Sequence, residues 1–437
     1  MVFLLRWCFL ELATIYNNGF PCVNNCDRHY AFFIYIEKSW LTPVSIFTGF
    51  WIIHILLFWL YLKIIDYRID SFFASSLLIM LFGFLSMGLG SLVGRYFTKN
   101  SVFFRCKVVH QKHLQNELIF LISLVFVLLI IIFNMQGKLL PTTIDMEALS
   151  SSITSARYGD HIAAPKVFMV ISFFTYFLVY YTNLLGGRLF VVSTSYLPKI
   201  ISILPLLVAF LAGAYNRGSR MGILIAIGLW LASLFANVIL LKGLNRGKQL
   251  SFAKIFLILA IIGVLGFLLS GFVTLARYGE ISSIVLVDAI LSIADYPGGF
   301  FAFSQIIEAS LVTDIDLRLG YHTLYRIFHF LGVTNSNIVV DVGFTSTNYL
   351  TIFGELIIDF GVLGLMLFFF FFGTVGGYSY KKVKNGDVRF VGILAIIYSY
   401  IFMSATFSVF SFMTPLAALI FFSYINFKKC YYPEDSR

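Results

Sequence analysis

Charged side chains are scarce in this sequence of 437 residues: only 12% are Asp, Glu, Lys or Arg, whereas 59% are hydrophobic. A water-soluble globule of this length needs far more polar surface than such a chain can supply. The composition therefore excludes a soluble protein and predicts an all-α polytopic integral membrane protein. Appended soluble domains, internal repeats and low-complexity tracts are also missing, so we interpret 1–437 as a single membrane domain.

Cysteine and proline are rare as well. All five cysteines lie in segments that the charge distribution assigns to the reducing side, so no disulfide framework is expected. Cys22, Cys26 and His29 lie close together but lack a second pair of ligands, and we expect neither a metal site nor a cofactor. With nine prolines and no repeated halves, the sequence also lacks the paired, interrupted helices that are typical of secondary transporters.

Long apolar runs dominate what is present. A run of about 20 apolar residues is long enough to cross a bilayer as a helix. Ten such runs predict ten transmembrane helices, and one or two more could lie in 1–40 or in the longest loop. The predicted runs are 42–63, 71–94, 118–135, 167–186, 200–216, 221–241, 255–273, 361–380, 389–410 and 412–427. The second run contains three closely spaced glycines, Gly88, Gly90 and Gly94. The glycines predict close helix packing, not a nucleotide-binding turn.

The distribution of charge predicts the topology. Lysine and arginine resist translocation and collect on the cytoplasmic side. With the N-terminus inside, about two-thirds of the 31 Lys and Arg residues fall in inside segments, and about two-thirds of the 21 acidic residues fall outside. Both termini are therefore expected in the cytoplasm. The net charge of +10 then reflects this bias and attraction to the lipid bilayer, and no nucleic-acid partner is expected.

The segment 274–360 is the longest stretch between apolar runs, and we expect a long extracytoplasmic loop with amphipathic helices there. Loops of this length are usually functional. Within it, RLGYHTLYRIFHFLG at 318–332 places Arg318, His322, Arg326 and His329 at intervals of four, four and three. A helix would carry these side chains on one face, as a cationic stripe that requires an anionic partner.

Arginines, with no lysine among them, gather at the predicted outer mouth of the bundle. They are Arg217, Arg220, Arg277, Arg318 and Arg326. The planar guanidinium group binds phosphate oxygens in bidentate geometry, so the expected ligand is a lipid-linked phosphate or pyrophosphate. Alternatively, these arginines bind ordinary phospholipid headgroups or pair with nearby acids. Glu355 and Asp359, four residues apart on a predicted helical face, are either acid–base groups or such ion-pair partners.

Several motifs resemble those of one family. They are Arg217 with Gly228 after ten intervening residues, Arg277 after its apolar run, YPGGFFAF at 296–303, GYHTLYRIF at 320–328 and NYLTIFGELIIDFGVLG at 348–364. With the hydropathy plan, they make the chain similar to the Wzy-type O-antigen and oligosaccharide repeat-unit polymerases. The resemblance implies a multi-pass bacterial inner-membrane glycosyltransferase with a periplasmic active site. Its implied substrate is an undecaprenyl-pyrophosphate-linked oligosaccharide, and a chain-length co-polymerase is a possible partner.

The resemblance and the residue chemistry together suggest roles. His322 is the first choice of general base, because an imidazole among arginines stays neutral and can accept a proton, and Glu355 or Asp359 are its substitutes. The expected substrate-binding residues are Arg217, Arg220, Arg277, Tyr278, Arg318, Tyr321, Arg326 and Asn348. Arginines that stabilise a departing pyrophosphate would make the reaction metal-independent. Two other functions stay open: the related O-antigen ligase, and a transporter or flippase of lipid-linked oligosaccharide.

Overall fold

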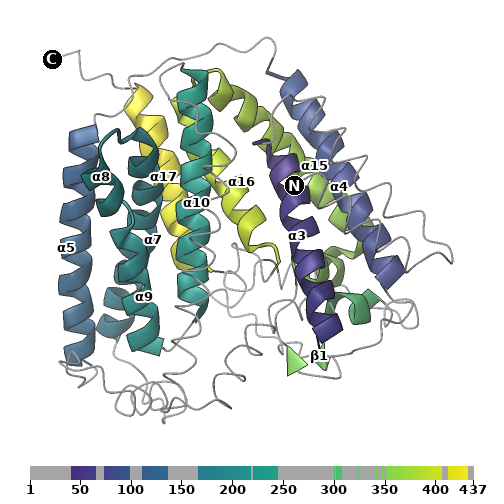
Figure 1. The fold of residues 1–437 in the computed structure, drawn as a ribbon, viewed down its shortest axis with the longest axis horizontal. Coiled ribbons are helices and arrows are strands. Elements are labelled where there is room, and N and C mark those ends of the chain that lie inside the picture. The colour runs from purple at the N-terminus through teal and green to yellow at the C-terminus, as the bar shows by residue number, and fades with distance from the viewer. Residues whose placement is uncertain are drawn as a thin grey trace.

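The computed structural model describes most of the apolar part of the chain. The described residues are 41–64, 73–98, 111–135, 166–217, 220–244, 351–405 and 412–431, with short pieces at 300, 302–307, 323, 340–341 and 346–347. Helices dominate these residues and run side by side as a bundle (Figure 1). A two-residue strand pair, β1 (Val340–Asp341) and β2 (Ser346–Thr347), lies within the predicted long loop and is antiparallel.

The helices follow the predicted apolar runs. They are α3 (Pro43–Ile64), α4 (Phe73–Tyr96), α5 (Gln111–Met135), α7 (Lys166–Val192), α8 (Tyr196–Ile201), α9 (Leu204–Arg217), α10 (Arg220–Gly243), α15 (Ile352–Lys384), α16 (Val391–Met403) and α17 (Met413–Tyr431), with a short 3-10 turn at Val388–Phe390. Every predicted run overlaps one of them except 255–273, which lies outside the described residues. Among the residues that the structure describes, six helical segments are long and apolar enough to cross a membrane, consistent with a polytopic membrane protein.

Helix α15 begins earlier than the predicted run at 361–380. Thr351 caps it, accepting a hydrogen bond from the Gly354 N–H (3.3 Å) at its side-chain hydroxyl. Gly361 interrupts the helical geometry with φ 68° and ψ −177°, a conformation that glycine adopts without the steric cost of a Cβ. The residues from Ile352 to Phe360 therefore form a separate first segment of α15, which we call the α15 entry segment. The end of the predicted loop is thus helical and buried.

Glycines bring α4 and α15 into backbone contact. A Cβ added at Gly90 or Gly94 of α4 would overlap the carbonyl oxygen of Phe370 or Thr374 on α15. The reverse holds for Gly373 and Gly377 of α15, whose added Cβ atoms would overlap carbonyl oxygens of α4. Such small-residue seams let helices approach closely in a membrane. The prediction of close packing is confirmed for Gly90 and Gly94.

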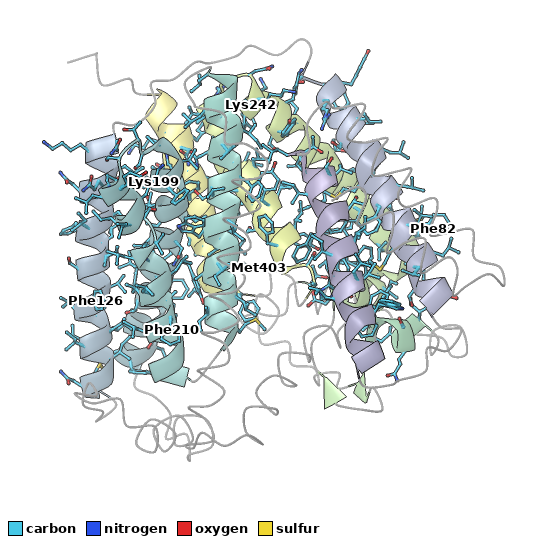
Figure 2. All side chains as sticks on the ribbon, viewed as in Figure 1. Phe82, Phe126, Lys199, Phe210, Lys242 and Met403 are labelled. Carbon is cyan, nitrogen blue, oxygen red and sulfur yellow. The ribbon has the colours of Figure 1, made fainter. Side chains whose placement is uncertain are left out.

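Cationic side chains gather at one end of the bundle. Arg95 of α4 and Lys384 of α15 both lie over the Tyr380 ring, at 5.2 and 5.7 Å from its centroid. Gly243, the last residue of α10, packs directly on the Lys384 carbonyl group. Lys199 and Lys242 lie toward the same end, at the top of Figure 2. Helices α4, α10 and α15 therefore all end here, and we call this the cationic end.

A buried arginine lies near the cationic end. Arg188 of α7 is only 2% exposed, and its Nη1 donates to the Asn426 side-chain oxygen of α17 (2.8 Å). The Asn426 amide in turn donates to the Phe422 carbonyl oxygen of its own helix (2.8 Å). Because a buried guanidinium must keep its hydrogen bonds, this pair fixes α7 against α17.

Candidate functional site

The α15 entry segment lies at the opposite end of the bundle from the cationic end. Helices α10 and α15 both end at the cationic end, so both begin at the other end (Figure 1). Arg217 is the last residue of α9 and Arg220 is the first of α10. The backbone therefore places both of these predicted arginines at the same end of the bundle as the start of α15.

Aromatic packing fixes the entry segment. Phe353 is fully buried, and its ring centroid lies 5.1 Å from that of Trp51 on α3 and 5.8 Å from that of Phe84 on α4. It also lies 5.9 Å from Phe303, a residue of the short helical piece at 302–307. Phe303 belongs to the YPGGFFAF motif and Phe353 to the NYLTIFGELIIDFGVLG motif. Two motifs that are far apart in the sequence therefore meet in the core.

Hydrogen bonds tie the entry segment to two other helices. The Ile352 N–H donates to the Ser404 carbonyl oxygen directly after α16 (2.9 Å). The Ser404 hydroxyl accepts from Trp51 Nε1 (2.9 Å) and donates to the Ile401 carbonyl oxygen (2.7 Å). The first of these bonds satisfies the Ile352 N–H, a backbone donor that the first turn of a helix leaves without an internal partner. The start of α15 is thereby held at a defined position against α3 and α16.

Gly228, which follows Arg217 after ten intervening residues, also lies in this region, near the end of α16. An added Cβ at Gly228 of α10 would lie 2.9 Å from Cε of Met403, the last residue of α16, labelled in Figure 2. Gly228 thus faces the end of α16, next to Ser404, and an added methyl group there would displace only the end of the flexible Met403 side chain.

Glu355 and Asp359 both lie on the entry segment and are buried, at 7% and 0% exposure. The Glu355 carboxylate acts electrostatically on Tyr400 of α16, whose ring packs on Phe372 at 4.6 Å. Asp359 Oδ2 accepts two hydrogen bonds from Thr323, one from its backbone N–H and one from its hydroxyl, each 2.7 Å long. Buried carboxylates of this kind can bind hydroxyl groups or accept protons.

The contact between Thr323 and Asp359 brings together two of the predicted motifs. Thr323 is the fourth residue of GYHTLYRIF and directly follows His322 in the chain. Asp359 is the second of the two acidic residues in the NYLTIFGELIIDFGVLG motif. The remaining predicted site residues, which are Arg277, Tyr278, Arg318, Tyr321, His322, Arg326 and Asn348, lie outside the described residues, as do the side chains of Arg217 and Arg220.

Sequence reasoning missed three residues of this site. Thr323 stands inside a motif, and its short polar side chain next to His322 was a usable signal. Trp51 and Ser404 gave no signal, because their roles depend on contacts across hundreds of residues. Within the part of the chain that the structure describes, no three His, Cys, Asp or Glu side chains are grouped as metal ligands would be.

No family model, curated protein or solved structure matches this chain. The motifs and the geometry of the site are therefore the basis for inferring function.

Proposed function

We propose that this protein is a membrane glycosyltransferase that polymerises undecaprenyl-pyrophosphate-linked oligosaccharide repeat units into O-antigen or a capsule-like polysaccharide. The observation that carries the proposal is the pair of hydrogen bonds from Thr323 to Asp359. It joins Thr323, the residue that follows His322, to Asp359 of the α15 entry segment. These are two of the motifs on which the resemblance to Wzy-type polymerases depends.

The proposed topology has ten transmembrane helices, or up to twelve, in a bacterial inner membrane. The cationic end, with Arg95, Lys242 and Lys384, faces the cytoplasm, as the positive-inside rule requires. Both termini are then cytoplasmic. The start of α15 faces the periplasm, where lipid-linked repeat units would be joined.

In the proposed reaction, a hydroxyl group at the non-reducing end of the incoming unit attacks the anomeric carbon of the growing glycan. The bond between that carbon and the pyrophosphate oxygen breaks, and undecaprenyl pyrophosphate leaves with the electron pair. His322 accepts the hydroxyl proton, with Glu355 as a substitute acceptor. Arg217, Arg220 and Arg277 bind the pyrophosphates, and Arg318 and Arg326 complete the anion site.

Other residues of the proposed site bind sugar. Tyr278 and Tyr321 would pack on sugar rings, whose apolar faces suit aromatic side chains. Asn348 would donate to or accept from sugar hydroxyl groups. A co-polymerase that regulates chain length is the proposed protein partner.

Elongation by the purified protein tests this proposal. We expect a synthetic undecaprenyl-pyrophosphate repeat unit, incubated with the protein in detergent and EDTA, to give a ladder of products that differ by one unit. Gel electrophoresis and mass spectrometry would measure product lengths, and a sample without protein is the control. Products formed only after lipid A–core is added would assign a ligase instead, and unchanged substrate in both samples would contradict a glycosyltransferase.

A further inference from the structure

One oxygen of the Asp359 carboxylate, Oδ2, is occupied by Thr323. Asp359 is fully buried and Thr323 is 3% exposed, and both hydrogen bonds from Thr323 reach the same oxygen, Oδ2. Both donors lie 2.7 Å from this oxygen. A proton arriving at Oδ2 would have to displace one of the two donors. This atom is therefore poorly placed to accept a proton from a sugar hydroxyl group.

The support behind Asp359 is rigid. The entry segment that carries it is fixed at its start by the bond from Ile352 to Ser404 and by the packing of Phe353 against Trp51. It ends at Gly361, where the positive φ separates its direction from the rest of α15. A side chain held on such a support can fix a second segment with precision.

The segment that Asp359 holds contains the proposed base. His322 precedes Thr323 directly, and consecutive Cα atoms lie only about 3.8 Å apart. Holding both the N–H and the hydroxyl of Thr323 fixes the main chain at the point from which the His322 side chain extends. A displacement of about 1 Å at a reacting group can cost roughly a hundredfold in rate.

We propose that Asp359 is a positioning residue that acts through Thr323, and that it is not the proton acceptor of the reaction. The effect on the rate rests on the proposed function, whereas the contact itself does not. Asp359 and Thr323 thus form an anchor that holds Thr323 of the GYHTLYRIF motif on the α15 entry segment. His322 and Glu355 are then the two remaining candidates for the base.

Substitutions that keep or remove the hydrogen bonds test the anchor. Asp359→Asn keeps a carbonyl oxygen that accepts both bonds, so we expect elongation within about fivefold of wild type with an unchanged pH profile. A general base replaced by an amide would instead cost about 10²- to 10⁴-fold. Asp359→Leu removes the acceptor, and we expect about a hundredfold loss, the cost of a misplaced reacting group. Thr323→Val should lower the rate by about tenfold and Thr323→Ser should restore it, because serine keeps the hydroxyl donor.

Hydrogen exchange gives a readout that does not depend on activity. The Thr323 amide should exchange slowly in the wild-type protein and in Asp359→Asn, and at least about tenfold faster in Asp359→Leu, because it loses its acceptor. Exchange at the amides of α16 serves as the control for global unfolding. Equal protection in all three proteins would overturn the anchor, as would a loss of 10²-fold or more in Asp359→Asn. A wild-type protein that shows the protected amide but no elongation would refute the proposed function alone.

Discussion

A His322→Ala protein is expected to elongate lipid-linked repeat units at least about a hundredfold more slowly than the wild-type protein, because a positioned general base contributes about 10²- to 10⁴-fold to a rate. In the proposed reaction, the attacking sugar hydroxyl must lose its proton as the new glycosidic bond forms. Without the imidazole, water or the buried Glu355 would have to accept that proton. The initial rate of product formation from a synthetic repeat unit measures the effect.

The matched control is His113→Ala. His113 lies in the first turn of α5, its side chain is 71% exposed, and it lies 3.9 Å from Glu117, which interacts electrostatically with Arg188 near the cationic end. Removing this imidazole should leave the elongation rate unchanged, since it lies far from the start of α15. An elongation rate for His322→Ala within threefold of the wild-type rate would eliminate His322 as the base and leave Glu355.

Gly373→Ala is expected to destabilise the protein by about 3 kcal/mol, at the upper end of the cost of overpacking. The added methyl group would overlap the Met87 carbonyl oxygen and lie 2.9 Å from the Met87 Cα. Both atoms belong to the backbone of α4, so relief requires the two helices to separate along their shared seam. Thermal unfolding in detergent should show a lower midpoint, and Gly373→Leu should abolish the monodisperse peak in size-exclusion chromatography.

Gly376→Ala is the control on the same helix. An added Cβ there would lie 3.4 Å from the Ile397 side chain and 3.5 Å from Pro43, which are ordinary contacts. Its unfolding midpoint should stay close to that of the wild-type protein. Equal midpoints for the Gly373 and Gly376 variants would show that the α4–α15 seam tolerates added volume, contrary to the glycine contacts described above.

Much of the helical plan follows from the sequence, because bilayer thickness sets the length of an apolar run. The positions of Gly90 and Gly94 inside one such run were enough to predict a close helix contact. The start of α15 was harder to predict. Glu355 and Asp359 lower the hydropathy before Gly361, so the predicted apolar run begins at Gly361. In the structure the helix begins at Ile352, and tertiary contacts bury both carboxylates.

The candidate site was predictable only in part. The motifs selected Glu355, Asp359 and the segment around His322, since polar residues are conspicuous in so apolar a chain. The partner of Asp359 was not predictable, because Thr323 and Asp359 lie 36 residues apart in the sequence and only the tertiary structure brings them together. The same holds for Trp51 and Ser404, whose bond joins helices that lie 353 residues apart in the sequence.

The two ends of the bundle differ in a way that suits a transferase acting on membrane-anchored substrates. Arg95 and Lys384 share the Tyr380 ring at one end, where anionic lipid can hold the protein in its orientation. At the other end, the α15 entry segment is fixed through Phe353, Ile352 and Asp359. A rigid support of this kind is what a site needs when catalysis depends on positioning and on charge stabilisation.

The contact between Thr323 and Asp359 joins the two motifs, and disulfide trapping measures it most directly. In a background in which the five native cysteines are replaced, Thr323→Cys combined with Asp359→Cys should form an intramolecular disulfide under mild oxidation, because the Thr323 hydroxyl and the Asp359 carboxylate are in contact at 2.7 Å. Thr323→Cys combined with Ser379→Cys, near the far end of α15, should not. Mass spectrometry of the linked peptides should identify the bond in the first protein alone. If both thiols of the first protein remained reactive toward maleimide after oxidation, that result would contradict the contact between Thr323 and Asp359.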